Sequence, residues 1–309
     1  MGLLQPTCFP QGTEKALSLA DLLFSTQLIQ ILQSLLSPRF DRIFEAITLL
    51  GNDAFLVGLT AIVYWCFDKR RGRLVTYILF LGAYLNFFLK VLIPWPRPPV
   101  ELRIVEKSES SYGFPSGNTQ DATTFWTWVS LDFRKRVLAV LGTVIVLAVG
   151  ISRIYLGVHY PAQVIGGWAI GFAVAGLGII TVKRIPWGGK EIHVTGQVLF
   201  AFATLIPLLI AVILGAAGEI NPGQIGGYLF AFSLGTIVEE RYVRFGTEIR
   251  ASRKAVRVVI GGVIVGSLVL ALDPILPLTY LVSAFANSFI RGLAVVLISP
   301  AVFKIIERR

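Results

Sequence analysis

Charged side chains are scarce in this sequence. Asp, Glu, Lys and Arg together make up 15% of its 309 residues, whereas soluble domains usually carry about 25%. Hydrophobic residues make up 55%, and they fall into repeated long apolar runs. The low charge and the apolar runs exclude an ordinary soluble fold and predict an all-α, polytopic helical membrane protein.

Cysteine is also rare, and the charge that remains has one dominant sign. The two cysteines, Cys8 and Cys66, are too few for a disulfide framework. The net charge is +10, which in a membrane protein reports topology. No interleaving of basic and aromatic residues indicates nucleic-acid binding. The expected partners are therefore membrane lipids, with no nucleic acid among them.

The apolar runs predict the membrane spans. The segment 16–37 is amphipathic and is interpreted as an interfacial helix, with a full span as the alternative. Two of the later spans, the third and the seventh, are short for a bilayer core of about 30 Å. The predicted spans lie at about 44–67, 74–95, 119–133, 136–156, 160–182, 194–217, 225–238, 255–273 and 279–303.

The loops between these spans differ in charge and so predict an orientation. One alternate set, at 157–161, 218–224 and 273–277, has no Lys or Arg. Because basic loops stay on the cytoplasmic side, the long loop at about 96–118 is expected on the outer face. The other set is rich in Lys and Arg and is expected in the cytoplasm: 68–73, 134–136, 183–190, 241–254 and the tail 304–309.

The unusual polar residues divide the chain into three parts. Residues 1–40 form an N-terminal segment with the interfacial helix, 41–185 form a core with nearly all of these polar residues, and 186–309 form accessory transmembrane helices. Arg291 interrupts the last span, so a buried partner is expected, with Asp273, Glu239 and Glu240 as candidates. The alternative is that Arg291 marks a second polar pathway.

The first polar cluster on the outer face is "KVLIPWPRPP", residues 90–99. Lys90 lies near the end of a span, and Arg97 follows seven residues later in a segment stiffened by proline. Two fixed cations at this spacing suit a phosphate or a sulfate. The alternative is a snorkelling lysine and an interfacial arginine.

The second cluster is "GFPSGNTQ", residues 113–120, which directly precedes a predicted span. Ser116 and Gly117 would therefore lie at a helix N-terminus, where unpaired N–H groups and a partial positive charge favour anions. The alternative is an ordinary N-cap made by Ser116 or Asn118.

The third cluster is "SRIYLGVHY", residues 152–160. Arg153 lies in or at the end of an apolar span, which is costly without a partner, and His159 lies on the outward loop. A single loop histidine is commonly incidental. Together, however, the three clusters combine cations, neutral donors and one imidazole nucleophile on one face, as phosphoryl transfer requires. No carboxylate cluster with metal-ligand spacing accompanies them, so metal-independent chemistry is expected.

These three clusters resemble the signature motifs of the type-2 phosphatidic acid phosphatase superfamily, which also includes the vanadium haloperoxidases. The superfamily pattern is Lys-x6-Arg-Pro, then Pro-Ser-Gly-His, then Ser-Arg-x5-His-x3-Asp. The spacing is intact in all three motifs, and the resemblance covers about residues 40–182, including the upstream segment 47–72. The matching positions are Lys90, Arg97, Pro98, Pro115, Ser116, Gly117, Ser152, Arg153 and His159.

Two positions depart from the pattern: Asn118 replaces the histidine of the second motif, and Gln163 replaces the aspartate of the third. The resemblance implies that His159 attacks phosphorus and forms a phosphohistidine. It also implies that residue 118 acts as general acid for the leaving alcohol and that residue 163 orients the nucleophile. The groups implied to hold the phosphate oxygens, here named the phosphate cage, are Lys90, Arg97, Arg153, Ser116 and the Gly117 amide.

Both departures affect proton and charge chemistry rather than phosphate binding. Asn118 can hydrogen-bond a leaving oxygen but cannot protonate it, and loss of a positioned acid costs about 10²–10⁴ in rate. Asp121, three residues later on the same helical face, is the first candidate for a substitute acid. His193 lies beside a predicted cytoplasmic loop, on the other side of the membrane.

The sequence therefore predicts a multi-pass cell-membrane phosphatase that acts on a lipid phosphate or diphosphate at the outer face. Phosphatidate-like lipids and polyprenyl diphosphates fit this prediction. The activity is expected to be impaired by Asn118 and Gln163, and no cofactor is expected. The alternative is a non-catalytic lipid-phosphate binder or transporter that uses the same phosphate cage, which the large C-terminal bundle favours.

Overall fold

The computed structural model describes residues 23–105, 112–184, 194–215 and 221–307. These ranges are almost entirely helices and their connections, and no β-strand occurs within them. The predicted all-α membrane fold is confirmed. Cys8, His193 and the first residues of the predicted interfacial segment lie outside the described ranges, whereas Cys66 is buried as a free thiol.

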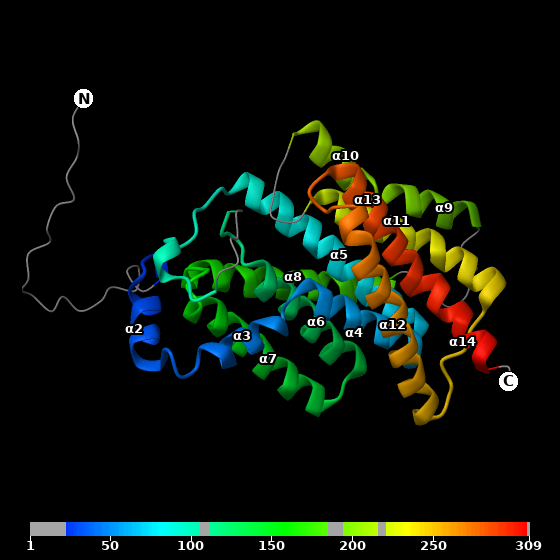
Figure 1. Ribbon diagram of the computed structural model, residues 1–309, viewed down its shortest axis with the longest axis horizontal. Coiled ribbons are helices and arrows are strands. Elements are labelled where there is room, and N and C mark those ends of the chain that lie inside the picture. Colours follow the sequence, from blue (N-terminus) through cyan, green and yellow to red (C-terminus); the bar gives the residue numbers. More distant parts are fainter. Residues whose placement is uncertain (1–22, 106–111, 185–193, 216–220, 308–309) are drawn as a thin grey trace, which may run out of the picture.

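The first half of the chain forms a bundle of antiparallel helices (Figure 1). A short 3-10 turn, η1 (Val100–Leu102), lies in the long connection between α5 and α6. The helices are α2 (Gln27–Leu36), α3 (Asp41–Leu49), α4 (Asp53–Cys66), α5 (Lys69–Leu92), α6 (Gly117–Phe133), α7 (Arg136–Tyr155) and α8 (Pro161–Arg184).

The C-terminal half packs beside this bundle. Its longest contact runs between α11 and α13, and α11 also packs on α5, where Phe80 stacks on Tyr228 with ring centroids 4.4 Å apart. The elements are α9 (Val194–Ala203), α10 (Ile206–Ile213), α11 (Pro222–Val238), the π-helical η2 (Glu239–Val243), α12 (Ala251–Ile275), α13 (Leu281–Leu293), the π-helical η3 (Ala294–Ile298) and α14 (Ser299–Glu307).

Six helices or continuous helix runs among the described residues are long and apolar enough to cross a membrane. The pair α3–α4, which is bent by 45° at residues 50–52, passes the same test only when its two helices are taken together as one broken span. The predicted short spans are α6 and α11, with 17 residues each, or about 25 Å. The six runs are Lys69–Leu92, Arg136–Tyr155, Pro161–Thr181, Val194–Ile213, Ala251–Ile275 and Leu281–Glu307.

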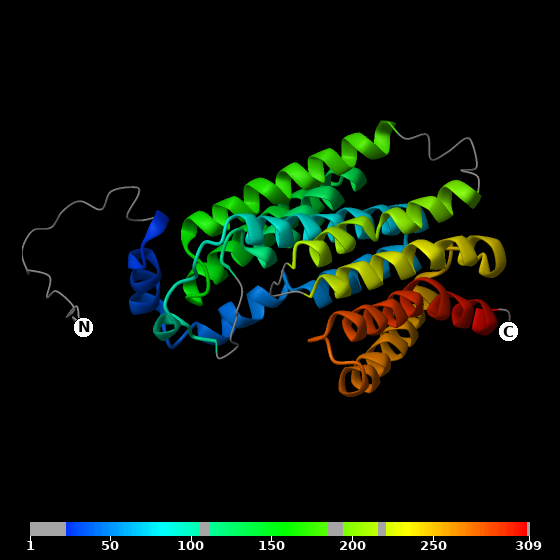
Figure 2. The same cartoon turned by 90° about the horizontal axis from the view of Figure 1, so that it is seen from above.

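Helix α2 lies across one end of the bundle rather than along it (Figures 1 and 2). It has 10 residues and is about 15 Å long, which is too short for a span. Its Gln33 Nε2 donates to the carbonyls of Leu102 and Tyr155, each at 2.8 Å. This position and length match an interfacial helix.

Capping residues fix where the core helices begin. The Asn52 side chain accepts from the Ala54 N–H and starts α4, and the Asp68 side chain accepts from the Arg71 N–H and starts α5. As a result Asp53 is the first residue of α4, and Lys90 falls in the last turn of α5. Because α4 and α5 are antiparallel, these two residues come to the same end of the bundle, the end that α2 crosses.

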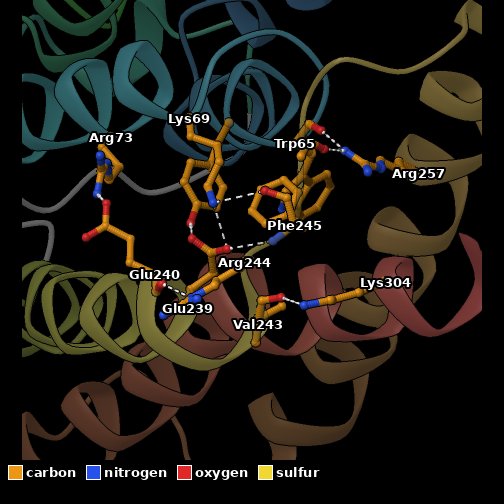
Figure 3. A network of polar contacts seen from close by, with 12 residues as sticks. Trp65, Lys69, Arg73, Glu239, Glu240, Val243, Arg244, Phe245, Arg257 and Lys304 are labelled. Carbon is orange, nitrogen blue, oxygen red and sulfur yellow. Dashed lines mark hydrogen bonds and ion pairs between the residues drawn. The ribbon is translucent and has the colours of Figure 1, made fainter. Parts of the chain in front are cut away.

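A polar network at the opposite end joins the C-terminal helices to the core (Figure 3). Glu239 is fully buried and accepts from Lys69 Nζ at 2.7 Å, from Tyr64 Oη at 3.2 Å and from the Phe245 N–H at 3.1 Å. Arg257 donates to the Trp65 carbonyl at 2.6 Å. Both contacts connect the C-terminal extension to the turn between α4 and α5.

Arg291 pairs with one of its three predicted candidates, but this partner is exposed rather than buried. Its Nη2 donates to Asp273 Oδ1 of α12, and Asn287 Nδ2 donates to the same oxygen at 3.1 Å. Glu239 and Glu240, the other predicted candidates, instead pair with Lys69 and Arg73. Arg291 therefore has a structural partner within the extension.

The network predicts different effects for two adjacent glutamates. Glu239→Ala leaves the Lys69 ammonium without its buried carboxylate and should lower the free energy of unfolding by about 3 kcal/mol. Glu240→Ala removes only a partly exposed pair with Arg73 and should cost about 0–1 kcal/mol. Thermal or denaturant unfolding in detergent measures both, and equal destabilisation would contradict the assigned role of Glu239.

Candidate active site

The three motifs meet at the end of the bundle that α2 crosses (Figure 1). Lys90 comes from the last turn of α5, and Arg97 comes from the connection that follows it. Ser116 is the N-cap of α6, and Arg153 lies in the last turn of α7. His159 occupies the short turn between α7 and α8. The alternating helix directions thus bring together residues that are up to 69 positions apart.

The His159 ring is buried, with 1% exposure, and both of its nitrogens have partners. Arg97 Nη1 lies 2.9 Å from Nε2, and Gln163 Oε1 lies 3.1 Å from Nδ1. A guanidinium can only donate, so Nε2 must be the unprotonated nitrogen. The proton then lies on Nδ1, which donates to Gln163.

The surroundings keep this ring neutral. Burial lowers the pKa of His159 well below its usual range. The charges of Arg97, Arg153 and Lys90, in that order, lower this pKa further. The hydrogen bond to Gln163 opposes the shift but does not reverse it. A neutral imidazole whose Nε2 carries no proton is the nucleophilic form.

Gln163 is held by three further contacts, which fix the orientation of its amide. Its Oε1 also accepts from the Tyr160 N–H at 3.1 Å, and its Nε2 donates to the Pro96 carbonyl at 2.8 Å. Its own carbonyl accepts from the Ser116 N–H at 3.1 Å. Gln163 therefore joins all three motifs and orients His159, although it supplies no negative charge.

The turn that carries His159 depends on a residue outside the motif pattern. Gly157 has φ +70°, and a Cβ there would lie 2.0 Å from the Leu102 carbonyl oxygen. The neighbouring Ile104 N–H donates to the Leu156 carbonyl at 3.2 Å. Only glycine accommodates both the left-handed backbone and this close approach. The connection between α5 and α6 is thereby fixed against the His159 turn.

The three cations of the phosphate cage are positioned by oxygen acceptors. Lys90 Nζ donates to the Tyr112 carbonyl at 2.7 Å, and Arg97 Nη1 donates to the Val158 carbonyl at 3.2 Å. Arg153 Nη1 donates to Thr48 Oγ1 at 3.2 Å. Lys90 and Arg153 are 6% and 5% exposed. Cations at this depth make strong, charge-assisted hydrogen bonds to an oxyanion.

The start of α6 supplies the neutral members of the cage. Ser116 Oγ lies 3.0 Å from Thr119 Oγ1, and the hydroxyl can donate to a phosphate oxygen while it accepts from Thr119. The Ser116 N–H already donates to Gln163. Asn118 is half-buried, and its Nδ2 lies 3.4 Å from the Thr48 carbonyl.

Asp121 lies one turn further along α6 and is 4% exposed. Its carboxyl group interacts with the carboxyl group of Asp53. The positive charge of Lys90 also acts on it. The sequence predicted Asp121 but not Asp53 or Thr48. Both lie in "ITLLGND", within the upstream segment 47–72 that also resembled the superfamily, which was the only available signal for them.

The described residues contain no group of three or more His, Cys, Asp or Glu side chains arranged to hold a metal ion. All predicted members of the site lie within the described ranges. His193, the other histidine of the chain, lies outside them.

Two family models match the sequence. The first, the PAP2 superfamily, matches residues 71–187, which contain all three motifs. The second, the transmembrane extension of PAP2 superfamily phosphatases, matches residues 223–308. The second match accounts for most of the C-terminal helices, for which the sequence motifs offered no assignment.

The chain is also similar in sequence to known phosphatases. Phosphatidylglycerophosphatase B of Bacillus subtilis is 31% identical over 147 residues, which are 43% of this chain and 71% of that protein. Undecaprenyl-diphosphatase of Sulfolobus acidocaldarius is 25% identical over 134 residues, which are 43% of this chain and 59% of that protein. The crystal structure of a PAP2-type phosphatidylglycerolphosphate phosphatase from Bacillus subtilis covers 54% of this chain and 87% of its own, with 25% identity and a TM-score of 0.46.

The matches extend across both halves of the chain, and the Bacillus relative is covered over most of its length. The resemblance that the three motifs indicated is therefore confirmed. The chain is a multi-pass membrane protein that belongs to the PAP2 superfamily of phosphatases.

Proposed function

We propose that this protein hydrolyses a lipid phosphate or diphosphate through a covalent phosphohistidine on His159. The observation that carries the proposal is the state of the His159 ring, whose unprotonated Nε2 lies 2.9 Å from Arg97 Nη1. An unprotonated ring nitrogen among three cations can both attack phosphorus and benefit from the charge stabilisation that phosphoryl transfer needs. The relatives named as a phosphatidylglycerophosphatase and an undecaprenyl-diphosphatase support this substrate class.

The reaction follows from the contacts. As the phosphoryl group enters, Arg97 gives up its hydrogen bond to His159 Nε2 and donates to a phosphate oxygen instead. Lys90 and Arg153 bind the other oxygens. His159 Nε2 then forms a bond to phosphorus while the bond to the leaving oxygen breaks. Gln163 holds the Nδ1 proton throughout, because its Oε1 accepts from that nitrogen at 3.1 Å. Water attacks the phosphohistidine and releases inorganic phosphate.

The two departures from the motif pattern set the expected rate. Gln163 orients the ring but adds no charge as imidazolium character develops, and loss of an orienting carboxylate costs about 10⁴ in serine proteases. Asn118 donates a hydrogen bond but holds no transferable proton. A diphosphate, whose leaving group needs no proton, is therefore the substrate that the Asn118 departure impairs least, whereas the Gln163 departure slows attack on any substrate.

The charge distribution supports an outward-facing site. Basic residues gather at the end of the bundle opposite His159, in the segments 69–73, 134–136 and 241–254. Since basic segments favour the cytoplasm, the phosphate cage belongs on the outer face of the cell membrane. In this arrangement, residues 41–185 form the catalytic core and 186–309 form an accessory bundle.

The test is phosphate release from diacylglycerol pyrophosphate, phosphatidate and a polyprenyl diphosphate in detergent micelles. The expected result is release that continues in EDTA, is lost in His159→Ala and is kept in the matched variant His193→Ala. If vanadate binds but neither this chain nor Asn118→His releases phosphate from any of the lipids, the enzyme proposal is wrong. The non-catalytic binder is then the better assignment.

The depressed pKa of His159 predicts the pH profile. Because the folded-state pKa lies below the usual value of about 6.5, the ring stays neutral and active as the pH falls through 6.5. The acidic limb of kcat/KM should therefore lie below pH 6.5. Arg97→Gln removes the largest charge contribution to this shift and should move the limb upward, together with a loss of rate. A limb fixed at the same pH in both proteins would refute this assignment.

The close approach of Gly113 to Gln163 predicts that a larger side chain at position 113 lowers activity by a steric effect. A Cβ at this position would lie 2.4 Å from Gln163 Nε2, so Gly113→Ala must displace the amide that orients His159. Loss of one such hydrogen bond, worth about 1–1.5 kcal/mol, should lower kcat/KM by roughly tenfold. Gly176→Ala in α8 meets no atom within 4 Å and serves as the control. Equal activity of the two variants would show that Gln163 is not needed in place.

A further inference from the structure

A pair of carboxyl groups lies beside the phosphate cage. Asp121 belongs to the second turn of α6, and Asp53 is the first residue of α4. We propose that Asp53 and Asp121 share one proton and deliver it to the leaving oxygen, as the general acid that Asn118 cannot be. This inference rests on the phosphatase function proposed above and names the proton source for that same site.

The start of α4 packs against the start of α6, because a Cβ at Gly51 would lie 2.7 Å from the Asn118 carbonyl oxygen. Asp121 interacts with Asp53 across this contact, and a hydrogen bond between two carboxyl groups requires that one of them is protonated. Asp121 is 4% exposed, and its Oδ1 is buried without a hydrogen-bond partner among the described residues. An ionised carboxylate in that position would be costly, so the arrangement favours one proton on the pair.

The pair is close to the reacting atoms. Asp121 lies three residues after Asn118, on the same face of α6. Lys90 acts electrostatically on both Asp121 and His159, so its ammonium is near both the pair and the nucleophile. The charged groups that act on Asp121 are Asp53 from α4 and Lys90 from α5. Asp53 is exposed whereas Asp121 is buried, so Asp53 is the member of the pair that a substrate can contact.

The proton balance closes over the two steps. In the first, His159 Nε2 bonds to phosphorus, the bond from phosphorus to the lipid oxygen breaks, and the pair gives its proton to that oxygen. The pair is then doubly negative, and Lys90 stabilises it. In the second, the pair removes a proton from the attacking water, the bond from phosphorus to nitrogen breaks, and inorganic phosphate leaves. The products are the lipid alcohol and phosphate, with one proton again on the pair.

Two lipids with the same tail separate acid catalysis from a structural role. Phosphatidate has an alkoxide leaving group that needs a proton, whereas the leaving group of diacylglycerol pyrophosphate is phosphatidate, whose phosphate oxygen does not need one. Asp121→Asn and Asp53→Asn each keep a hydrogen-bonding side chain of the same size but remove the transferable proton. Each variant should lower phosphatidate turnover by about 10²–10⁴ and lower diacylglycerol pyrophosphate turnover by less than tenfold.

A rescue and a control complete the experiment. Asn118→His in the Asp121→Asn background should restore phosphatidate turnover, because it supplies an acid one turn away. Glu101→Gln, an exposed carboxyl near the same end, should leave the ratio of the two rates unchanged.

The inference is overturned if both lipids lose the same factor, if neither loses any, or if the unmodified chain hydrolyses only the diphosphate. In each case activity that still depends on His159 leaves the proposed function standing. If the unmodified chain releases no phosphate, or if His159→Ala releases as much, the proposed function fails and this inference fails with it.

Discussion

The arrangement of the site depends on the two hydrogen bonds that hold the His159 ring. Arg97 at Nε2 and Gln163 at Nδ1 fix both the tautomer and the direction of the electron pair. Gln163 is itself held by the segment of Arg97, because its Nε2 donates to the carbonyl of Pro96, the residue before Arg97. The ring, the guanidinium and the amide form a closed set of contacts between the α5–α6 connection and the start of α8. A displacement of any one of them moves the other two.

The phosphate cage concentrates positive charge where burial makes charge expensive. Lys90 and Arg153 are nearly buried, and both act on His159 together with Arg97. Carbonyl and hydroxyl oxygens of Tyr112, Val158 and Thr48 position these cations. The three cations repel one another when no anion is bound. A bound phosphoryl group would relieve this repulsion with its negative charge, so the site favours anions. Lys90 also acts electrostatically on Asp121, so the charge of the phosphate cage extends to the carboxyl pair.

Much of this could be predicted from the sequence, and the remainder has identifiable physical reasons. The apolar runs and the motif spacings predicted the helices and the residues at their ends, because hydrophobic periodicity and charged residues in apolar surroundings are strong local signals. Arg291 pairs with Asp273, which was one of its three predicted candidates.

The contacts missed by sequence reasoning are of two kinds. The carbonyls of Pro96, Tyr112 and Val158 belong to the backbone, which every residue possesses, so no sequence letter marks them. Asp53 and Thr48 are side chains, but their roles depend on the bend between α3 and α4, and the only sign of that bend within the predicted span 44–67 is the short turn sequence Gly51-Asn52-Asp53.

That bend also determines how Thr48 and Asp53 are placed relative to each other. Thr48 lies at the end of α3 and contacts Arg153, while Asp53 begins α4 and contacts Asp121. Residues 50–52 lie outside both helices, so one residue more or fewer there would move the start of α4 relative to the end of α3 and separate one of these side chains from its partner on α6 or α7. The three residues 50–52 therefore act as a spacer of fixed length. Variation in the hydrophobic face of α4 changes packing, whereas variation in the length of this spacer changes which side chains face the site.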